Sequence, residues 1–336
     1  MRYLILLITS LSFLPAAHAF DRAKLVSSFF STVMVRGYKS DGGLAYGSGV
    51  IVDKDKVLTN CHVLRDSGKP WVSRGEDSYV VESVQADRWH DLCLVTTSGL
   101  PGDPAVIATD APLKRGQEAV AIGHSSGSPA PLTSMGSIQS LYPLDGGDVI
   151  RSTAGFSLGA SGSGLYDGEG HLIGINTFKT VGRKAYYYAL PIKWLDTVKA
   201  LPVETKFPIK GEAFWEAEKD KKPYFMQVAV PQLNKDWPTL AEIAQHWTEA
   251  QPNSTEAWYE LGVAQENLGQ QAQAENAYRK SVTLDPLNTD SLYRIGVIAS
   301  KKGDKDEMHA INLSILDIDK DLAAEFSKEV GCNGAC

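Results

Sequence analysis

The first part of the chain carries short apolar runs separated by turn signals, a pattern typical of β-strands. Turns rich in Asp and Gly, such as Asp41-Gly42-Gly43 and Asp145-Gly146-Gly147, punctuate these runs. Many short strands with few helical periods predict β-barrels or sandwiches. The predicted strands include residues 33–35, 49–52, 56–58, 78–81, 92–95, 119–122, 148–150, 172–175 and 186–189.

From Trp237 onward the apolar residues recur at helical spacing, as Leu240, Ile243, Ala244 and Trp247 do. The interval before this change contains several prolines and little periodicity. We therefore predict a multidomain chain, with an all-β part followed by an all-α part. The predicted divisions are a β-rich domain at 20–204, a linker at 205–235 and a helical domain at 236–336.

The N-terminus has the features of a secretory signal peptide. Arg2 is followed by a short apolar run, and Ala17-His18-Ala19 has the small-x-small form of a cleavage site. We predict that residues 1–19 are removed near Ala19 and that the protein is periplasmic or secreted; an uncleaved anchor is the alternative. No later segment has the length of a membrane span, so none is expected after signal removal.

Composition and charge exclude two classes of protein. Apolar residues make up 43% and charged residues 22% of the chain, which excludes a mostly disordered protein. Residues 236–336 carry 17 acidic and 8 basic residues, a net charge of −9, so all of the chain's net charge of −7 arises there. Because neither part has a basic stripe, no nucleic-acid partner is expected.

Three segments offer, in chain order, the groups that acyl transfer needs. They are the strand and turn leading to His62, the strand beginning at Asp91, and the Gly- and Ser-rich loop around Ser161. A serine hydroxyl attacks only when a base takes its proton, and a carboxylate orients that base. We predict His62 as base, Asp91 as orienting carboxylate and Ser161 as nucleophile, with the N–H groups of Gly159 and Ser161 as oxyanion hole.

The order of these residues distinguishes between the folds that could carry them. An α/β-hydrolase places its Ser before its His, within Gly-x-Ser-x-Gly, whereas here position 163 is Ser and the order is His, Asp, Ser. This order and the strand-rich pattern match the two-barrel chymotrypsin arrangement.

Residues 30–196 resemble the HtrA/Deg branch of trypsin-like serine proteases. The resemblance lies in Leu58-Thr59-Asn60-Cys61-His62-Val63, in Asp87 and Asp91, and in Gly170-His171-Leu172-Ile173-Gly174-Ile175-Asn176-Thr177. It implies a chymotrypsin-like double β-barrel. The chain departs from the family at Ala160 and Ser163, where Asn and Gly are common, and helices stand in place of the usual PDZ domain.

The resemblance also implies a specificity pocket. Its walls would include Phe156, Asn176, Thr177 and Ala189. Since no Asp or Glu stands at the positions that match the bottom of this pocket, we expect a preference for substrates with uncharged side chains there.

The helical part fits the 34-residue tetratricopeptide (TPR) pattern over residues 255–288. A second, degenerate repeat follows through about residue 320, with Leu292, Ile295 and Gly296 at matching positions. Such arrays bind extended partners in a concave groove, so a protein partner there is expected. The matching residues of the first repeat are Trp258, Leu261, Gly262, Ala274, Tyr278 and Pro286.

The four cysteines have no zinc-site spacing. Cys61 and Cys93 flank the proposed His and Asp, and folding could join them or leave two buried thiols; Cys332 and Cys336 could close a small ring. No metal or organic cofactor is expected, and His90, His124, His171, His246 and His309 are assigned no role.

Two hypotheses follow. The first is a serine endopeptidase that cleaves protein or peptide substrates through an acyl-enzyme, with the TPR part docking substrates or partners. The alternative is a non-catalytic or latent protease-fold scaffold that binds proteins.

Overall fold

A computed structural model describes residues 22–108, 111–180 and 186–332. The predicted signal peptide therefore lies outside the described residues. Within the described ranges, no helix is both long and apolar enough to cross a membrane.

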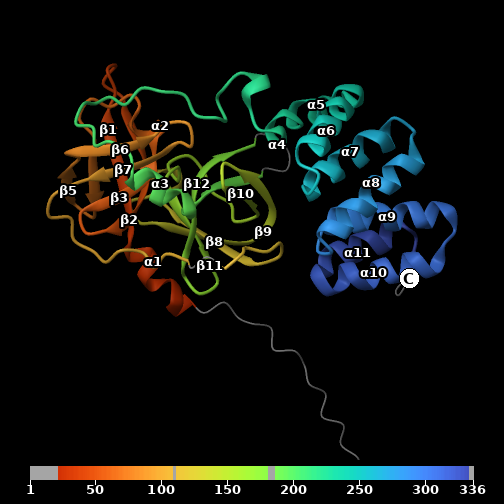
Figure 1. Ribbon diagram of the computed structural model, residues 1–336. Helices are drawn as coiled ribbons and strands as arrows, with labels where there is room; N and C mark the ends of the chain where they lie inside the picture. The colour runs from red at the N-terminus through yellow and green to blue at the C-terminus, as the bar shows by residue number, and fades with distance from the viewer. Residues whose placement is uncertain (1–21, 109–110, 181–185, 333–336) are drawn as a thin grey trace, which may run out of the picture.

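The β-rich part consists of two curled antiparallel sheets (Figure 1). The first sheet has the strand order β5-β4-β1-β2-β3-β7-β6, and the second closes into a barrel with the order β10-β13-β12-β11-β8-β9. The predicted all-β, chymotrypsin-like fold followed by helices is confirmed. The strands are β1 (Thr32–Tyr38), β2 (Leu44–Asp53), β3 (Lys56–Asn60), β4 (Trp71–Arg74), β5 (Asp77–Val80), β6 (Ser83–Asp87), β7 (Leu92–Thr96), β8 (Glu118–Gly123), β9 (Leu132–Leu144), β10 (Gly147–Ser152), β11 (Ser163–Asp167), β12 (Leu172–Lys179) and β13 (Tyr187–Pro191).

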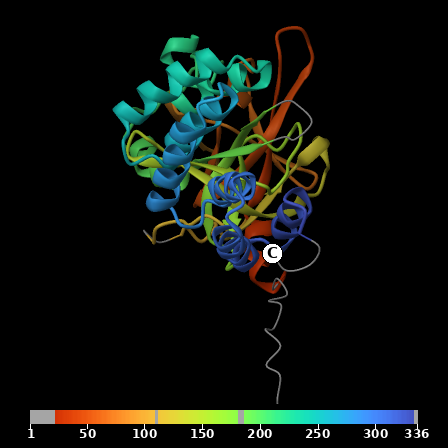
Figure 2. The same ribbon diagram turned by 90° about the vertical axis from the view of Figure 1, so that its right-hand side faces the viewer.

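Short helices cover the ends of the sheets, and longer ones form an arc beside the second barrel (Figures 1 and 2). The short ones are η1 (Arg22–Leu25), α1 (Val26–Phe30), α2 (Cys61–Leu64), η2 (Ser125–Gly127), η3 (Ile192–Trp194), α3 (Leu195–Lys199), η4 (Lys219–Lys221), α4 (Tyr224–Gln227) and α5 (Ala229–Asn234). The arc comprises α6 (Trp237–Ala250), α7 (Thr255–Asn267), α8 (Gln271–Leu284), α9 (Thr289–Lys302), α10 (Lys305–Ile318) and α11 (Lys320–Glu329).

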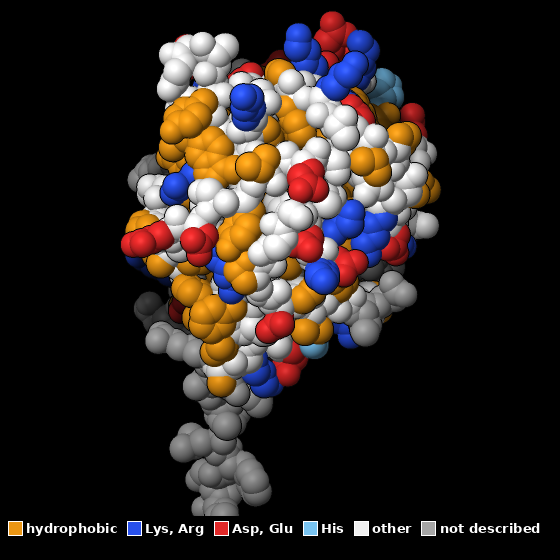
Figure 3. Space-filling view, turned by 90° about the vertical axis from the view of Figure 1, so that its left-hand side faces the viewer, with side chains coloured by type: hydrophobic (Ala, Val, Ile, Leu, Met, Phe, Trp, Pro, Cys, Tyr) orange, Lys and Arg blue, Asp and Glu red, His pale blue; other side chains and the backbone are white. Residues whose placement is uncertain are grey.

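Burial of the strands differs between the interior and the edge of the first sheet. In β3 and β7 nearly every residue is buried, because both faces of this central pair are covered. At the outer end of the first sheet, viewed in Figure 3, apolar side chains lie scattered among charged ones. There Val80 of β5 is largely exposed, as expected of an edge strand.

The helical repeat packs through small residues. A Cβ atom on Gly262 would lie 2.6 Å from the Tyr278 ring, so only glycine lets α7 and α8 approach this closely. Gly296 allows the same contact with Phe326 of α11. These residues are therefore packing positions, as expected of stacked helical repeats.

The helical arc and the second barrel share one apolar core. Phe225 stacks on Tyr142 of β9 with ring centroids 4.4 Å apart, and Trp247 of α6 lies in the same cluster. Arg115, which precedes β8, pairs with Glu256 of α7 and donates through Nε to Asp285 at 2.9 Å. Removing a partner from such a buried pair leaves an uncompensated charge, so these contacts fix the arc against the barrel.

A disulfide links Cys61, which follows β3, to Cys93 in β7, with Cα atoms 5.0 Å apart. The two segments that carry His62 and Asp91 are thus joined covalently. Of the two predicted bridges, the one involving Cys336 lies outside the described residues.

Removing this bridge is expected to destabilise the protein. A cross-link across a sequence separation of 32 residues restricts the unfolded chain by about 3–4 kcal/mol. Cys61→Ala/Cys93→Ala should therefore lower the free energy of unfolding by roughly that amount in denaturant titrations under oxidising conditions. Under reducing conditions, where the wild type also lacks the bridge, the two proteins should have the same free energy of unfolding. Equal free energies of unfolding under oxidising conditions would contradict the prediction.

A second prediction concerns Glu260 of α7, whose Oε2 atom is shielded from solvent and has no hydrogen-bond partner in the described part of the chain. Burial, with the nearby Glu256 and Asp290 charges, raises the pKa of Glu260 to about 8 although Arg151 opposes the shift. The folded state therefore holds a proton that the unfolded state loses above about pH 4.5. Stability should fall as pH rises from there to about 8.

Glu260→Gln should make unfolding free energy less dependent on pH in this window, measured by urea titration at several pH values. Glu242→Gln, at an exposed position of α6, is the matched control. Parallel pH profiles for wild type and Glu260→Gln would contradict the assignment.

Candidate active site

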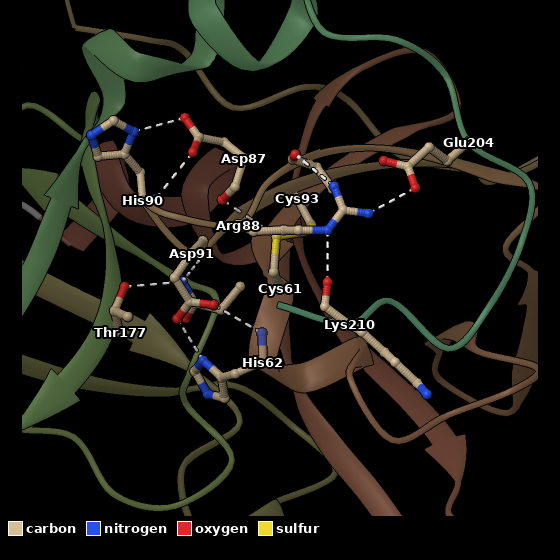
Figure 4. The surroundings of a disulfide bond; sticks show 12 residues. Cys61, His62, Asp87, Arg88, His90, Asp91, Cys93, Thr177, Glu204 and Lys210 are labelled. Atoms are coloured by element: carbon tan, nitrogen blue, oxygen red, sulfur yellow. Dashed lines mark hydrogen bonds and ion pairs between the residues drawn. A yellow bond between two sulfur atoms is a disulfide. The ribbon is translucent and has the colours of Figure 1, made fainter. Parts of the chain in front are cut away.

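His62 and Asp91 meet where β3 ends beside the beginning of β7. The register pairs Asn60 with Leu92, so α2 begins next to the residue that precedes β7. Asp91 Oδ2 lies 2.6 Å from His62 Nδ1, and Asp91 Oδ1 accepts the His62 backbone N–H at 2.8 Å (Figure 4). The Asp91 side chain has no exposed surface, whereas that of His62 is 24% exposed.

This pairing decides how the imidazole is used. Because a carboxylate accepts at Nδ1, that nitrogen carries the proton and Nε2 is left as the proton acceptor. Asp91 adopts a left-handed backbone conformation with φ of 55°. Asp tolerates this region better than most residues, which allows its carboxylate to turn back onto His62.

Ser161 lies in a loop of two consecutive turns before β11. Ala160 N–H donates to Ser157 O and Ser163 N–H to Ala160 O, with Gly159 and Gly162 in the positive-φ positions. A Cβ atom on Gly162 would lie 2.2 Å from Ser48 O. Glycine is therefore required where the loop touches the first sheet.

Ser48 of β2 fixes this loop. Its N–H donates to Ser161 O at 2.7 Å, and its hydroxyl donates to Gly159 O at 2.8 Å. The same hydroxyl accepts from His124 N–H at 2.9 Å. Three backbone segments thus meet at one buried side chain.

The predicted oxyanion donors belong to this fixed loop. Leu158 O accepts from Ser126 N–H at 2.6 Å, and since N–H and C=O of one trans peptide point in opposite directions, Gly159 N–H points away from Ser126. Neither Gly159 N–H nor Ser161 N–H has an acceptor within the described residues. Both are available to bind a developing oxyanion.

Ser161, the predicted nucleophile, and His62, the predicted base, share no hydrogen bond within the described residues. Ser161 Oγ donates to Thr177 O at 3.3 Å, and no bond between it and His62 Nε2 is present in the part of the chain described. Such bonds are often loose without substrate and tighten in the complex. Asn60 Nδ2 links the two sides, donating to Asp91 O at 2.9 Å and to Thr177 Oγ1 at 3.0 Å.

Only part of the predicted specificity pocket lines a cleft. Phe156, packed on Tyr187, borders a cleft of about 340 Å³ together with Ala160 and Ser163, and none of its described lining residues is charged. Asn176 and Ala189 are instead buried within the second barrel, and Thr177 is buried beside Asn60.

His90, adjacent to Asp91, has partners of its own. Its Nδ1 lies 2.7 Å from Asp87 Oδ2 and its Nε2 3.0 Å from Asp145 Oδ2. Burial lowers the pKa of His90, but the two carboxylates outweigh it and raise the pKa overall. His90 therefore connects the sheets and does not face Ser161. Within the described ranges, no group of three His, Cys, Asp or Glu side chains is placed to hold a metal.

Sequence reasoning missed three residues at this site: Ser48, Asn60 and Trp215. Trp215 Nε1 donates to Asp91 Oδ2 at 3.2 Å. Asn60 stands inside the family motif Leu58–Val63, which was a signal for it, and Ser48 lies in the strand that leads to this motif. Trp215 lies in the predicted linker, where no pattern indicated a contact.

Comparison with known proteins finds a similarity for each of the two parts of the chain. Residues 47–175 match the trypsin-like peptidase domain family, and residues 255–288 match the tetratricopeptide repeat. A probable periplasmic serine endoprotease DegP-like of Chlamydia trachomatis is 31% identical over 43% of this chain and 31% of its own length. The anti-sigma-I factor RsgI9 of Acetivibrio thermocellus is 31% identical over 44% of this chain and 21% of its own length.

Among solved structures, the active form of the Rv3671c protease of Mycobacterium tuberculosis covers 58% of this chain and 89% of its own. The TM-score is 0.51 with 22% identity, which supports the fold alone. The chain spans between a fifth and a third of the length of these two curated relatives. Residues 47–175 are thus similar to trypsin-like peptidase domains, among them that of a DegP-like relative, and residues 255–288 are similar to a tetratricopeptide repeat.

Proposed function

We propose that the protein is a serine endopeptidase using His62, Asp91 and Ser161. The observation that carries the proposal is the 2.6 Å contact between His62 Nδ1 and Asp91 Oδ2. Asn60 and Thr177 connect this pair to the glycine-bracketed Ser161, whose loop has two available N–H donors. This arrangement supplies a base, its orienting carboxylate, a nucleophile and an oxyanion site.

In the proposed reaction, Ser161 Oγ turns from Thr177 O toward His62 Nε2 and gives it a proton while attacking the substrate carbonyl. The resulting oxyanion binds the N–H groups of Gly159 and Ser161. Protonated His62 then donates to the leaving amine, and the C–N bond breaks to give the acyl-enzyme. Water, deprotonated by His62, releases the acid and restores Ser161.

The cleft beside Phe156 supports a preference for uncharged side chains at the cleavage site, since its described lining carries no charge. The TPR region supports docking of a protein substrate or partner beside the barrel. The N-terminal pattern and the DegP-like relatives support a periplasmic or secreted location.

A latent or non-catalytic scaffold is the second candidate. The bond from Ser161 Oγ to Thr177 O favours it, because within the described residues the hydroxyl is bonded to a carbonyl and not to His62.

Replacing Ser161 tests the proposal directly. A fluorophosphonate probe should label the wild-type chain once, at Ser161, and Ser161→Ala should abolish labelling and reduce casein cleavage by about 10⁴-fold or more. Ser157→Ala, a nearby serine in the same loop, should keep both activities within a few-fold. A wild-type chain that is never labelled, even with unfolded protein added, would favour the scaffold.

The Ser161→Ala chain should also trap substrate. Photo-cross-links from bound unfolded casein should map to residues 236–336 as well as to the barrel. Cross-links confined to the barrel would exclude substrate docking by the TPR region.

Gly159→Ala tests the oxyanion hole. The φ of Gly159 is 95°, and a Cβ atom would lie 2.7 Å from His124 O, so the loop must shift and displace a donor. We expect kcat to fall by about 10²–10³. Gly146→Ala is the control, since φ there is 78° and no atom lies within 4 Å of its Cβ position. Similar kcat values for both variants would contradict this role of Gly159.

A further inference from the structure

Residues 209–217, here called the strap, cross the active-site end of the barrels between α3 and α4 (Figure 1). The strap has no regular helix or strand, yet Ile209, Ala213 and Phe214 are buried. Phe214 lies in the apolar core shared with the second barrel, and its N–H donates to Trp89 O at 2.9 Å. The strap is thus docked on the barrels along its length.

One ion pair and one hydrogen bond hold the strap to the segments that carry His62 and Asp91, here called the dyad. Glu216 lies 2.7 Å from Arg65, which directly follows the helix containing His62. Arg88, three residues before Asp91, donates to Lys210 O at 2.7 Å and pairs with Glu204 (Figure 4). Both ends of the strap are therefore anchored near the residues it covers.

Between these anchors, Trp215 contacts both members of the dyad. Its Nε1–H donates to Asp91 Oδ2 at 3.2 Å, the same oxygen that binds His62 Nδ1. Its ring meets the His62 ring edge to face, with centroids 5.5 Å apart, and lies 5.8 Å from the Phe178 ring.

The Asp91 carboxylate consequently has three donors: the His62 backbone, His62 Nδ1 and the Trp215 indole. An oxygen with two donors in different directions resists rotation of the carboxylate, which would break both bonds. The indole also covers a carboxylate with no exposed surface, so water cannot replace it as the partner.

Resting on the proposed function, we propose that Trp215 is a positioning residue for catalysis. Its indole N–H holds Asp91, and its ring limits movement of His62, so that Nε2 faces Ser161. The catalytic dyad is completed by a residue from the connection between barrel and TPR region. A shift of that connection would alter the dyad without changing any reacting group.

Trp215→Phe tests this inference, because it keeps an aromatic ring and removes the N–H. We expect kcat to fall by about tenfold with KM within twofold, since the hydrogen bond orients the base and does not contact substrate. Trp71→Phe is the control: Trp71 also loses an indole bond, to Ser73, but lies on β4, separated from β3 by β1 and β2. Its kcat should stay within twofold of wild type.

A measurement independent of activity accompanies the kinetics. In ¹⁵N-labelled protein, the Trp215 indole N–H resonance, assigned by its loss in Trp215→Phe, should shift in Asp91→Asn, while that of Trp71 should not. An unshifted resonance, or wild-type kcat in Trp215→Phe, would overturn the positioning role and leave the proposed function intact. A wild-type chain that is never labelled at Ser161 would refute the proposed function and the catalytic role together.

Discussion

The proposed active site depends on one buried side chain, Ser48, where the loop that carries Ser161 meets the first sheet. Through its N–H and hydroxyl, Ser48 binds Ser161 O and Gly159 O, and its hydroxyl accepts from His124 N–H. His62 and Asp91 lie next to strands of the first sheet, and Ser161 lies next to β11 of the second. Their relative position is therefore set by hydrogen bonds that cross between the barrels, in surroundings where an unpaired polar group would be costly.

Around this junction, each sheet contributes a different kind of order. The Cys61–Cys93 bridge and the β3–β7 register hold His62 next to Asp91. Glycines at positive φ shape the loop around Ser161, and their backbone positions leave no room for a Cβ atom. Covalent and steric constraints thus position the segments that the weaker hydrogen bonds then join at the site.

The sequence predicted those features that depend on local pattern. Strand alternation and the short motifs around His62, Asp91 and Ser161 each leave a signal within a few residues, and the TPR pattern leaves one within its 34-residue period. Asn176 and Ala189 were placed by resemblance in a pocket wall, but barrel packing buries them. Trp215 was not predicted because an irregular segment has no periodicity, so its docking depends on contacts far away in the chain. The prolines that suggested a linker indicate an irregular backbone, but they do not indicate which residues this segment contacts.

The central claim is that both barrels contribute to one reaction centre, and a crystal structure after treatment with a peptide phosphonate tests it most directly. The account predicts a bond from phosphorus to Ser161 Oγ, the phosphonyl oxygen within hydrogen-bond distance of Gly159 and Ser161 N–H, and His62 Nε2 beside the adduct. An adduct on another residue, or one bound to Ser161 with its oxygen turned away from both N–H groups and from His62, would contradict the account.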